Sequence, residues 1–254
     1  MRVVGIIPAR LNASRFPSKP MAEIHGIPMI GHCYHRTRLA LGIENTYVAT
    51  CDDIIAKYVD GIGGMSVMTS ENHTRATTRT AEALAKIEAS IGGEIDIVVM
   101  VQGDEPLILP ETIAATLEHF KDEDVSIVNI MSRLTDYDQF LDKNNVKVVV
   151  SAKNDALYFS REPIPSPWRG TEGVPMFMQT GIIAFRRNTL LEFNKTDETL
   201  LEKIESIDMN RVLECGGQIS MVLTDAKTIG VDTFEELGLA ADLMKFDPVL
   251  GLYK

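Results

Sequence analysis

Three basic residues lie close together near the N-terminus, in the segment IIPARLNASRFPSKP. Arg10, Arg15 and Lys19 fall within ten residues of one another, and Ser14 adds a hydroxyl. Clustered cations bind polyanions such as a triphosphate, and the prolines restrict the loop and lower the cost of ordering it. The segment lacks the GxxxxGK[ST] pattern of a P-loop, and an ordinary basic surface loop is the alternative. The residue types favour phosphate binding over that alternative.

Two aspartates are candidate ligands of a divalent metal. Asp104, in VQGDEP, follows an apolar run, and Asp232, in GVDT, follows another. On neighbouring strand ends, two such carboxylates can hold Mg²⁺ against phosphate oxygens. Each residue also has a structural alternative, a turn or cap for Asp104 and a helix N-cap for Asp232. The two aspartates together favour a metal site more strongly than either residue does alone.

A third candidate region joins VATCDD to the later segment HTRATTRTAE. Thr50 and Asp52 are small polar residues that follow an apolar run and could line a pocket for a base. Arg79 could reach the base or a phosphate. Taken alone, Arg75 and Arg79 are slightly more typical of a solvated helix face, so the sequence leaves their role open.

These residues sit at the ends of predicted strands. Apolar runs predict strands over 2–7, 45–50, 66–69 and 95–101, and helical spacing predicts helices over 29–41, 77–91 and 110–120. Strands that alternate with helices indicate an α/β fold with a mainly parallel sheet and helices on both faces. Such sheets bind ligands at the carboxyl ends of their strands, which is where the candidate residues lie.

A different pattern occupies the middle of the chain. Residues 125–132, 146–151 and 182–186 are predicted strands with no long helix between them, which indicates an antiparallel excursion from the core. A helix over 200–215 is then stopped by Gly216, and a strand over 219–224 and a closing helix over 233–245 follow. The length of 254 residues fits one large domain.

Composition narrows the class of protein. A net charge of −11 disfavours a nucleic-acid coat, because duplex binding rests on neutralising phosphates with Lys and Arg. Three widely spaced cysteines without a CxxC pattern argue against disulfides and a zinc site. No signal peptide and no membrane-length apolar run is recognisable, so we expect a cytoplasmic protein.

Taken together, these segments resemble the CMP-sugar synthetases, and most closely the 3-deoxy-manno-octulosonate (KDO) cytidylyltransferases. The resemblance covers nearly the whole chain in order, through IIPARLNASRFPSKP, VATCDD, VQGDEPLI, NNVKVVVSAKNDALYFSREPIP and IGVDTFEEL. It implies a nucleotide-diphospho-sugar transferase-like domain over residues 1–254, with a small inserted antiparallel dimerisation sheet within about 125–190. It also implies a homodimer that uses CTP and Mg²⁺ to convert a 2-keto-3-deoxy sugar acid into a CMP-sugar and pyrophosphate, for cell-surface glycans such as lipopolysaccharide.

The resemblance assigns roles to individual residues. The implied nucleotide-binding residues are Pro8, Ala9, Arg10, Ser14, Arg15, Lys19, Thr50, Asp52 and Arg79. The implied sugar-binding residues are Gln102, Arg161, Gln179 and Glu205, and the implied magnesium ligands are Asp104 and Asp232. Catalysis would rest on Arg10, Lys19 and Asp104.

The departures from the family pattern concentrate on the sugar side. The HLGxYAY segment becomes QTGIIAF over residues 179–185, and LEQLR becomes IDMNR over 207–211. HxSGTDR becomes HTRATTR over 73–79, whereas most phosphate and metal positions are kept. A site that hydrogen-bonds one substrate's hydroxyls rejects analogues that leave its polar groups unpaired. We therefore expect an altered acceptor, such as an amino-substituted KDO.

Other functions fit the same sequence. The acceptor could be a nonulosonic acid or a non-sugar acid, and the nucleotide could be UTP or GTP. A catalytically silent relative that only binds nucleotide is a further alternative. Retention of Arg10, Lys19, Asp104 and Asp232 together disfavours the silent relative, because such a protein needs no paired metal carboxylates.

Overall fold

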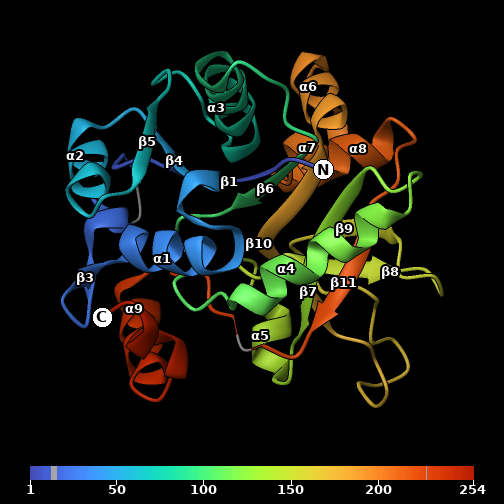
Figure 1. Ribbon diagram of the computed structural model, residues 1–254. Coiled ribbons are helices and arrows are strands. Elements are labelled where there is room, and N and C mark those ends of the chain that lie inside the picture. The colour runs from blue at the N-terminus through green and yellow to red at the C-terminus, as the bar shows by residue number, and fades with distance from the viewer. Residues whose placement is uncertain (13–15, 227) are drawn as a thin grey trace.

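A mixed β-sheet forms the centre of the protein (Figure 1). The structure is a computed structural model that describes residues 1–12, 16–226 and 228–254. Within these residues nine strands form one sheet, with its main path in the order β11-β7-β10-β6-β1-β4-β5. β6, β1, β4 and β5 run parallel, as do β7 and β11, whereas β10 is antiparallel to both of its neighbours β6 and β7. The predicted α/β class is confirmed.

The elements have the following bounds. The strands are β1 (Val3–Ala9), β2 (Glu23–Ile24), β3 (Ile27–Pro28), β4 (Thr46–Thr50), β5 (Met65–Met68), β6 (Ile97–Val101), β7 (Ile127–Arg133), β8 (Lys147–Val150), β9 (Ala156–Ser160), β10 (Phe177–Arg186) and β11 (Ser220–Thr224). The α-helices are α1 (Met29–Leu41), α2 (Asp53–Gly61), α3 (Ala76–Ile91), α4 (Pro110–Glu118), α5 (Tyr137–Leu141), α6 (Arg187–Lys195), α7 (Leu200–Glu205), α8 (Met209–Glu214) and α9 (Phe234–Met244). Short 3-10 helices are η1 (Lys19–Met21), η2 (Ile43–Asn45), η3 (His119–Lys121) and η4 (Pro248–Leu252).

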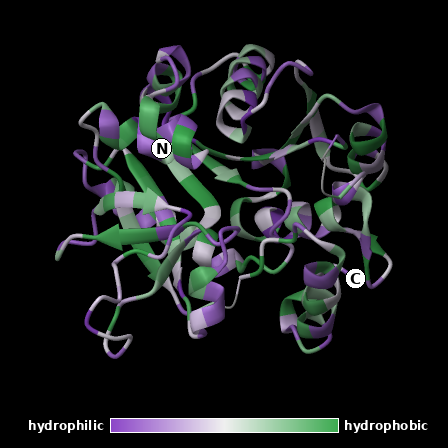
Figure 2. Cartoon of the chain, turned by 180° about the vertical axis from the view of Figure 1, so that it is seen from behind, coloured by the Kyte–Doolittle hydropathy of each residue, from purple (hydrophilic) through white to green (hydrophobic). Residues whose placement is uncertain are grey.

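Strand β6 shows why the central strands are continuous apolar runs. Val98 and Met100 face the apolar cluster that includes α3, α6 and α8, whereas Val99 and Val101 face the cluster that includes α1, α2 and α4. Successive strand residues point to opposite faces, so a strand covered on both sides needs apolar residues throughout. From behind, the central strands are mostly hydrophobic and the surrounding helices are mixed (Figure 2).

The middle of the chain is antiparallel, as predicted, but it is continuous with the main sheet. β8 pairs with β10, and β9 pairs with β8, so both extend from the central path. A separate two-stranded antiparallel sheet is instead formed by β2 and β3, directly after the first loop. The sequence prediction missed β9 and α6 and found only the second half of β10.

The predicted single helix over 200–215 is wrong. Ser206 takes a left-handed conformation with φ of 56°, which ends α7, and the chain restarts as α8 at Met209. The carbonyls of Glu205 and Ser206 accept hydrogen bonds from the Arg161 guanidinium at 2.8 and 3.4 Å. Hydrogen bonds from Arg161 thus satisfy carbonyls that a continued helix would have used. The sequence around residue 206 could not predict them, because Arg161 is distant in the chain.

A third apolar cluster lies under α9 and ties the first loop to the C-terminal region. Phe16 packs there with Leu107, Val231 and Met244. Because Val231 directly precedes Asp232, this packing fixes the position of a candidate metal ligand. No helix within the described ranges is long and apolar enough to cross a membrane.

A buried polar network holds η4 and the residues around it against α1. Arg36 is fully buried, forms an ion pair with Asp247 and donates to the Tyr253 hydroxyl at 3.1 Å. His32 Nε2 donates to the Ile24 carbonyl at 2.8 Å, so its Nδ1 accepts from the Tyr253 hydroxyl at 2.8 Å. Burial lowers the pKa of His32 to about 4, with the charge of Arg36 adding to the effect and the Ile24 hydrogen bond opposing it.

Acid should therefore loosen this region through His32. Between pH 6.5 and about 4 the unfolded chain binds a proton at His32 that the folded protein does not, so stability falls as pH falls through this window. The shift corresponds to about 3 kcal/mol of unfolding free energy lost by pH 4. Urea denaturation of the wild type and of His32→Gln, whose amide does not titrate, should give free energies that converge by this amount toward pH 4. Parallel pH profiles for the two proteins would contradict the assignment.

Candidate active site

Lys19 joins three distant segments at the carboxyl edge of the sheet. Its Nζ lies 2.8 Å from Asp104 Oδ2 and 2.9 Å from Asp232 Oδ1. Burial opposes the charge on Lys19, but the two carboxylates outweigh it and hold its pKa above the ordinary value. A charged lysine therefore stands between the two candidate metal ligands.

The loop after β1 is anchored by the end of β4. The Asp52 carboxylate accepts a hydrogen bond from the Leu11 amide at 2.8 Å, and the Asp52 amide donates to Thr50 Oγ1 at 3.1 Å. Among the described residues that line the two cavities at this edge, Thr50 and Asp52 are not included. Asp52 thus holds the loop and Thr50 holds Asp52, and their predicted contact with the nucleotide stays a prediction. The predicted residues Ser14 and Arg15 lie outside the described part of the chain.

Asp232 reaches the site by a route that the sequence prediction got wrong. β11 is separated from β6 by β7 and β10, so Asp104 and Asp232 do not follow neighbouring strands. The chain after β11 crosses the sheet edge, and the Val231 amide donates to the Asp104 carbonyl at 2.9 Å.

The helix cap at this point belongs to another residue. Thr233 is the N-cap of α9 and forms a capping box with Glu236, so the N-cap alternative for Asp232 is wrong. Glu236 also accepts from the Asp232 amide at 2.7 Å, which fixes the backbone of that residue. The side chain of Asp232 is thereby left to face Lys19.

A first cavity of about 250 Å³ opens beside Lys19. The predicted residues that line it are Pro8, Ala9, Arg10, Lys19, Arg79, Gln102 and Asp104. Arg79 is only 2% exposed, so its alternative as a solvated helix residue is wrong. Its Nη1 donates to Thr69 Oγ1 at 2.5 Å, and its buried Nη2 has no hydrogen-bond partner among the described residues. A buried guanidinium with an unused donor in a cavity wall suits an anionic or carbonyl-bearing ligand.

His73 shapes the same cavity and was missed as a site residue. Its carbonyl accepts from Arg10 Nη1 at 3.2 Å, and its ring contacts Glu82 Oε2 at 2.5 Å and Thr78 Oγ1 at 3.0 Å. Burial opposes ionisation of Glu82, but hydrogen bonds from Lys86, Ser70 and His73 outweigh it and lower its pKa to about 2. Arg10 is thus held at the cavity rim by a well-anchored loop.

A second cavity of about 310 Å³ adjoins the first. The two share Thr74, Arg75, Ala76, Gln102 and Asp104. The predicted residues Arg161, Gln179 and Asp232 line only the second cavity. Two cavities that meet at Gln102 and Asp104 can hold two substrates whose reacting atoms lie at the junction.

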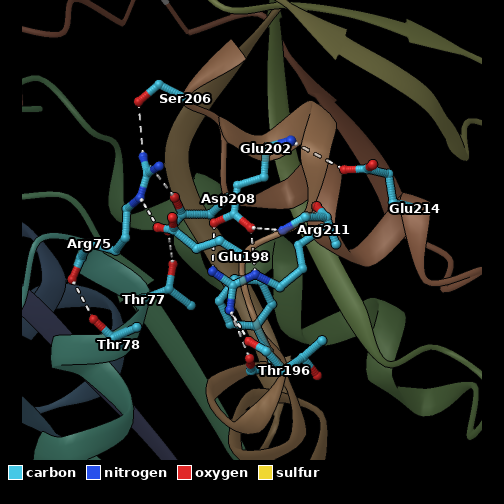
Figure 3. A network of polar contacts seen from close by, with 12 residues as sticks. Arg75, Thr77, Thr78, Thr196, Glu198, Glu202, Ser206, Asp208, Arg211 and Glu214 are labelled. Carbon is cyan, nitrogen blue, oxygen red and sulfur yellow. Dashed lines mark hydrogen bonds and ion pairs between the residues drawn. The ribbon is translucent and has the colours of Figure 1, made fainter. Parts of the chain in front are cut away.

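Arg75 forms the wall between the cavities through an ionic network that spans three helices (Figure 3). It contacts Glu198 at 3.3 Å, Ser206 Oγ at 3.0 Å and Asp208 at 3.5 Å. Asp208 also accepts from Thr77 Oγ1 at 2.7 Å, yet burial raises its pKa. Arg75 precedes α3, so its contacts fix that helix against α7 and α8. The sequence analysis left the role of Arg75 open.

Glu205 supports the second cavity without lining it among the described residues. Its carboxylate accepts from the Arg161 amide at 2.9 Å and from Ser160 Oγ at 2.7 Å. Burial opposes ionisation, but these bonds and that of Tyr158 keep the pKa of Glu205 below its ordinary value. Glu205 therefore positions Arg161, and its predicted contact with the sugar stays a prediction.

A bulge in β10 aims residues into the second cavity. The register of β10 against β7 shifts between Gln179 and Ile183, and Asn129 Nδ2 fills the gap by donating to the carbonyls of Thr180 and Ile182 at 3.2 and 2.9 Å. A Cβ atom at Gly181 would lie 2.7 Å from the side chain of Gln102, so glycine permits this close approach.

Glu105 lies behind the same bulge and accepts from the Gly181 amide. Burial raises its pKa to about 7, with the Gly181 bond opposing the rise and the charge of Asp104 adding to it. Glu105 thus carries a proton over part of the neutral range and fits beside Asp104 without a second full charge.

The donor set at Lys19 fits Mg²⁺ that arrives with a nucleotide. Across the described ranges, no group of three or more His, Cys, Asp and Glu side chains could hold a metal. Magnesium in proteins is commonly bound by one or two carboxylates together with substrate phosphates. Asp104 and Asp232 converge on one cation, Lys19 Nζ, and so provide two such carboxylates.

Comparison with known proteins gives a consistent result. The sequence pattern of the family described as cytidylyltransferase matches residues 4–225. The chain is 40% identical to a 3-deoxy-manno-octulosonate cytidylyltransferase of Geobacter metallireducens, over 93% of this chain and 95% of that one. It is 38% identical to the protein of the same name from Fusobacterium nucleatum, over 96% and 98%, and 36% identical to that from Escherichia coli, over 91% and 92%.

Solved structures show the same relationship. A CMP:2-keto-3-deoxy-manno-octonic acid synthetase complexed with CTP superposes with a TM-score of 0.87 at 34% identity, over 96% of this chain and 99% of that one. A cytidylyltransferase from Leptospira borgpetersenii shares the fold alone, with a TM-score of 0.64 at 15% identity over 97% and 88%. The resemblance found in the motifs is confirmed.

The bulge in β10 should depend on Asn129. Asn129→Ala leaves two buried carbonyls of β10 without their donor, which should lower the free energy of unfolding by roughly 2 kcal/mol. Urea denaturation measures this, with Asn194→Ala on the exposed side of α6 as a control expected to stay within about 0.5 kcal/mol of wild type. Equal effects from the two substitutions would show that Asn129 does not hold the bulge.

Proposed function

The chain belongs to the cytidylyltransferase family, and from this premise we propose that it transfers CMP from CTP to a KDO-type 2-keto-3-deoxy sugar acid. The products are a CMP-sugar and pyrophosphate. One observation carries the proposal: the two cavities meet at Gln102 and Asp104, directly beside Lys19 and Asp232. KDO is the acceptor in the names of the relatives, and it is our reference acceptor here.

The first cavity is proposed to take CTP. Arg10, Lys19 and Arg79 all line it, and Arg10 and Lys19 are proposed to bind the triphosphate. Ion pairs between these cations and phosphate oxygens favour the leaving pyrophosphate, because its charge grows as the bond to the α-phosphorus breaks. Specificity for CTP over UTP or GTP rests on the family relationship.

The second cavity is proposed to take the acceptor acid, with Arg161, Gln102 and Gln179 as its polar contacts. The acceptor's anomeric hydroxyl oxygen attacks the α-phosphorus in line and releases its proton to solvent. A new oxygen–phosphorus bond forms as the bond between the α-phosphorus and pyrophosphate breaks. The residues at the junction contribute mainly by holding the two substrates in contact, which is the larger part of the catalysis expected for such a transfer.

Asp104 and Asp232 would hold Mg²⁺ once a nucleotide is bound. The metal would supply positive charge to the phosphate oxygens. Lys19 forms ion pairs with both carboxylates, so a triphosphate that draws Lys19 toward itself leaves them available to a cation. In the empty enzyme Lys19 Nζ lies between the two carboxylates, and in the loaded enzyme the metal would lie there instead.

We also propose a cytoplasmic homodimer. All three cysteines are free thiols, which suits a reducing compartment. The segment over 125–190 exposes Leu157 at 60% and Trp168 at 89%, large apolar side chains of the kind that interfaces cover. Analytical ultracentrifugation tests the dimer, and a monomer at micromolar concentration would contradict it.

Asp104→Asn tests the enzyme against a silent nucleotide binder. The substitution keeps the shape of the side chain but removes its charge, so turnover of CTP and KDO with Mg²⁺ should fall by about 100-fold or more. Pyrophosphate release measures turnover, and calorimetry without metal should show that CTP still binds. Asp242→Asn on the exposed side of α9 is the control and should leave both measurements unchanged. A wild type that binds CTP but releases no pyrophosphate would identify the silent binder.

A further inference from the structure

Arg75 places a positive charge where the two cavities meet. Among the described residues that line both cavities, it is the only basic one. Its side chain is 20% exposed, and its carbonyl accepts from the Thr78 hydroxyl at 3.1 Å, which fixes the residue at the start of α3. The family pattern HxSGTDR has Ser where this chain has Arg75, so the charge distinguishes this chain from the pattern.

The second cavity has an excess of negative charge. Among the described residues of its lining, the acidic ones outnumber the basic ones, with Asp104, Glu105, Asp208, Asp232 and Glu236 against Arg75 and Arg161. An acceptor acid brings a further carboxylate into this cavity, and a charge that leaves water needs a partner of opposite sign. The acceptor carboxylate should therefore contact one of the two arginines.

The two arginines differ in how their donors are engaged. In Arg161 each of the three side-chain nitrogens donates to a backbone carbonyl. Within the described residues, the contacts of Arg75 use Nε toward Glu198 and Nη1 toward Ser206 and Asp208 (Figure 3). A guanidinium has five N–H donors, so Arg75 keeps the two on Nη2 for a ligand. Arg75 is thus the better placed of the two to bind a carboxylate.

The chemistry of the acceptor brings two anionic groups to this junction. In a 2-keto-3-deoxy acid the anomeric carbon carries both the reacting hydroxyl and the carboxylate. When that hydroxyl attacks the α-phosphorus, the carboxylate lies next to the α-phosphate. The two anions repel each other unless a cation lies between them. A planar guanidinium can bind both at once through separate N–H donors.

We propose that Arg75 binds the carboxylate of the acceptor and the α-phosphate of CTP at the same time, and so acts as a catalytic residue of the transfer. This role rests on the proposed function and adds a residue to it. The contacts with Glu198, Ser206 and Asp208 already hold the guanidinium in the wall, which lowers the cost of ordering it when the substrates bind. Negative charge that develops on the α-phosphate oxygens during attack is then stabilised by the same cation.

Arg75→Gln tests this role, because glutamine keeps a polar side chain but removes the charge. With CTP and Mg²⁺, kcat/KM for KDO, measured by pyrophosphate release, should fall about 100-fold, the loss expected when one donor to a transition-state oxyanion is removed. Arg187→Gln is the matched control, because the Arg187 side chain is 24% exposed and also pairs with two carboxylates, those of Glu88 and Glu94. It lies outside the described lining of both cavities, so kcat/KM should be unchanged.

A second acceptor separates substrate contact from a merely structural role. The C1 carboxamide of KDO keeps the shape of the acceptor but lacks its negative charge. In wild type, Arg75 favours the acid over the carboxamide, so the ratio of kcat/KM for KDO to that for the carboxamide should fall at least about tenfold in Arg75→Gln. Arg187→Gln should keep the wild-type ratio. A substitution that only disturbs packing should slow both acceptors equally.

Equal losses for the two acceptors in Arg75→Gln, or no loss for either, would overturn the role of Arg75 and leave the proposed function intact. Thermal denaturation checks that the variant is folded. If it is not, or if wild type does not turn over the carboxamide, a crystal structure of wild type with α,β-methylene-CTP and KDO decides. The Arg75 guanidinium should then lie within about 4 Å of both the acceptor carboxylate and the α-phosphate, and a larger distance to either contradicts the role.

The proposed function has its own outcome in the same experiment. A wild type that binds CTP but releases no pyrophosphate with either acceptor would overturn the proposed function itself and the role of Arg75 with it.

Discussion

The contact of Lys19 with two carboxylates is the constraint on which the rest of the site depends. Its partners lie 85 and 213 positions away in the sequence, so no local element can form it. Asp52 anchors the loop that carries Lys19, and Val231 and Glu236 fix the chain around Asp232. The sheet supplies a common edge, and the apolar cluster under α9 brings the three segments to it.

The second cavity depends on a distorted strand, whereas the contacts of Lys19 depend on a loop. Asn129 satisfies the carbonyls that the bulge in β10 leaves open, and Gly181 lets this strand approach the end of β6. Glu105 fits behind it because its raised pKa spares the site a second full negative charge beside Asp104. The part of the second cavity formed by β10 is therefore held by backbone geometry.

Local signals in the sequence predicted the scaffold and part of the site. Helix α1 has the predicted bounds. Asp104 was found because the end of the continuous apolar run that forms β6 is visible in the sequence. The crossing that delivers Asp232 was not predictable, since it depends on β10 entering the sheet between β6 and β7. The burial of Arg79 and the break at Ser206 depend likewise on which partners the folded chain brings near. Strand ends are local properties, whereas convergence at a site is a property of the whole sheet.

The long sequence separation of the Lys19 contacts also governs when the protein becomes chemically competent. Contacts this distant form only after the intervening loops have closed, so they belong to the late events of folding. A chain whose α9 has not docked lacks the second carboxylate beside Lys19. Docking of α9 and completion of the Lys19 contacts are therefore coupled, because Asp232 lies just before this helix.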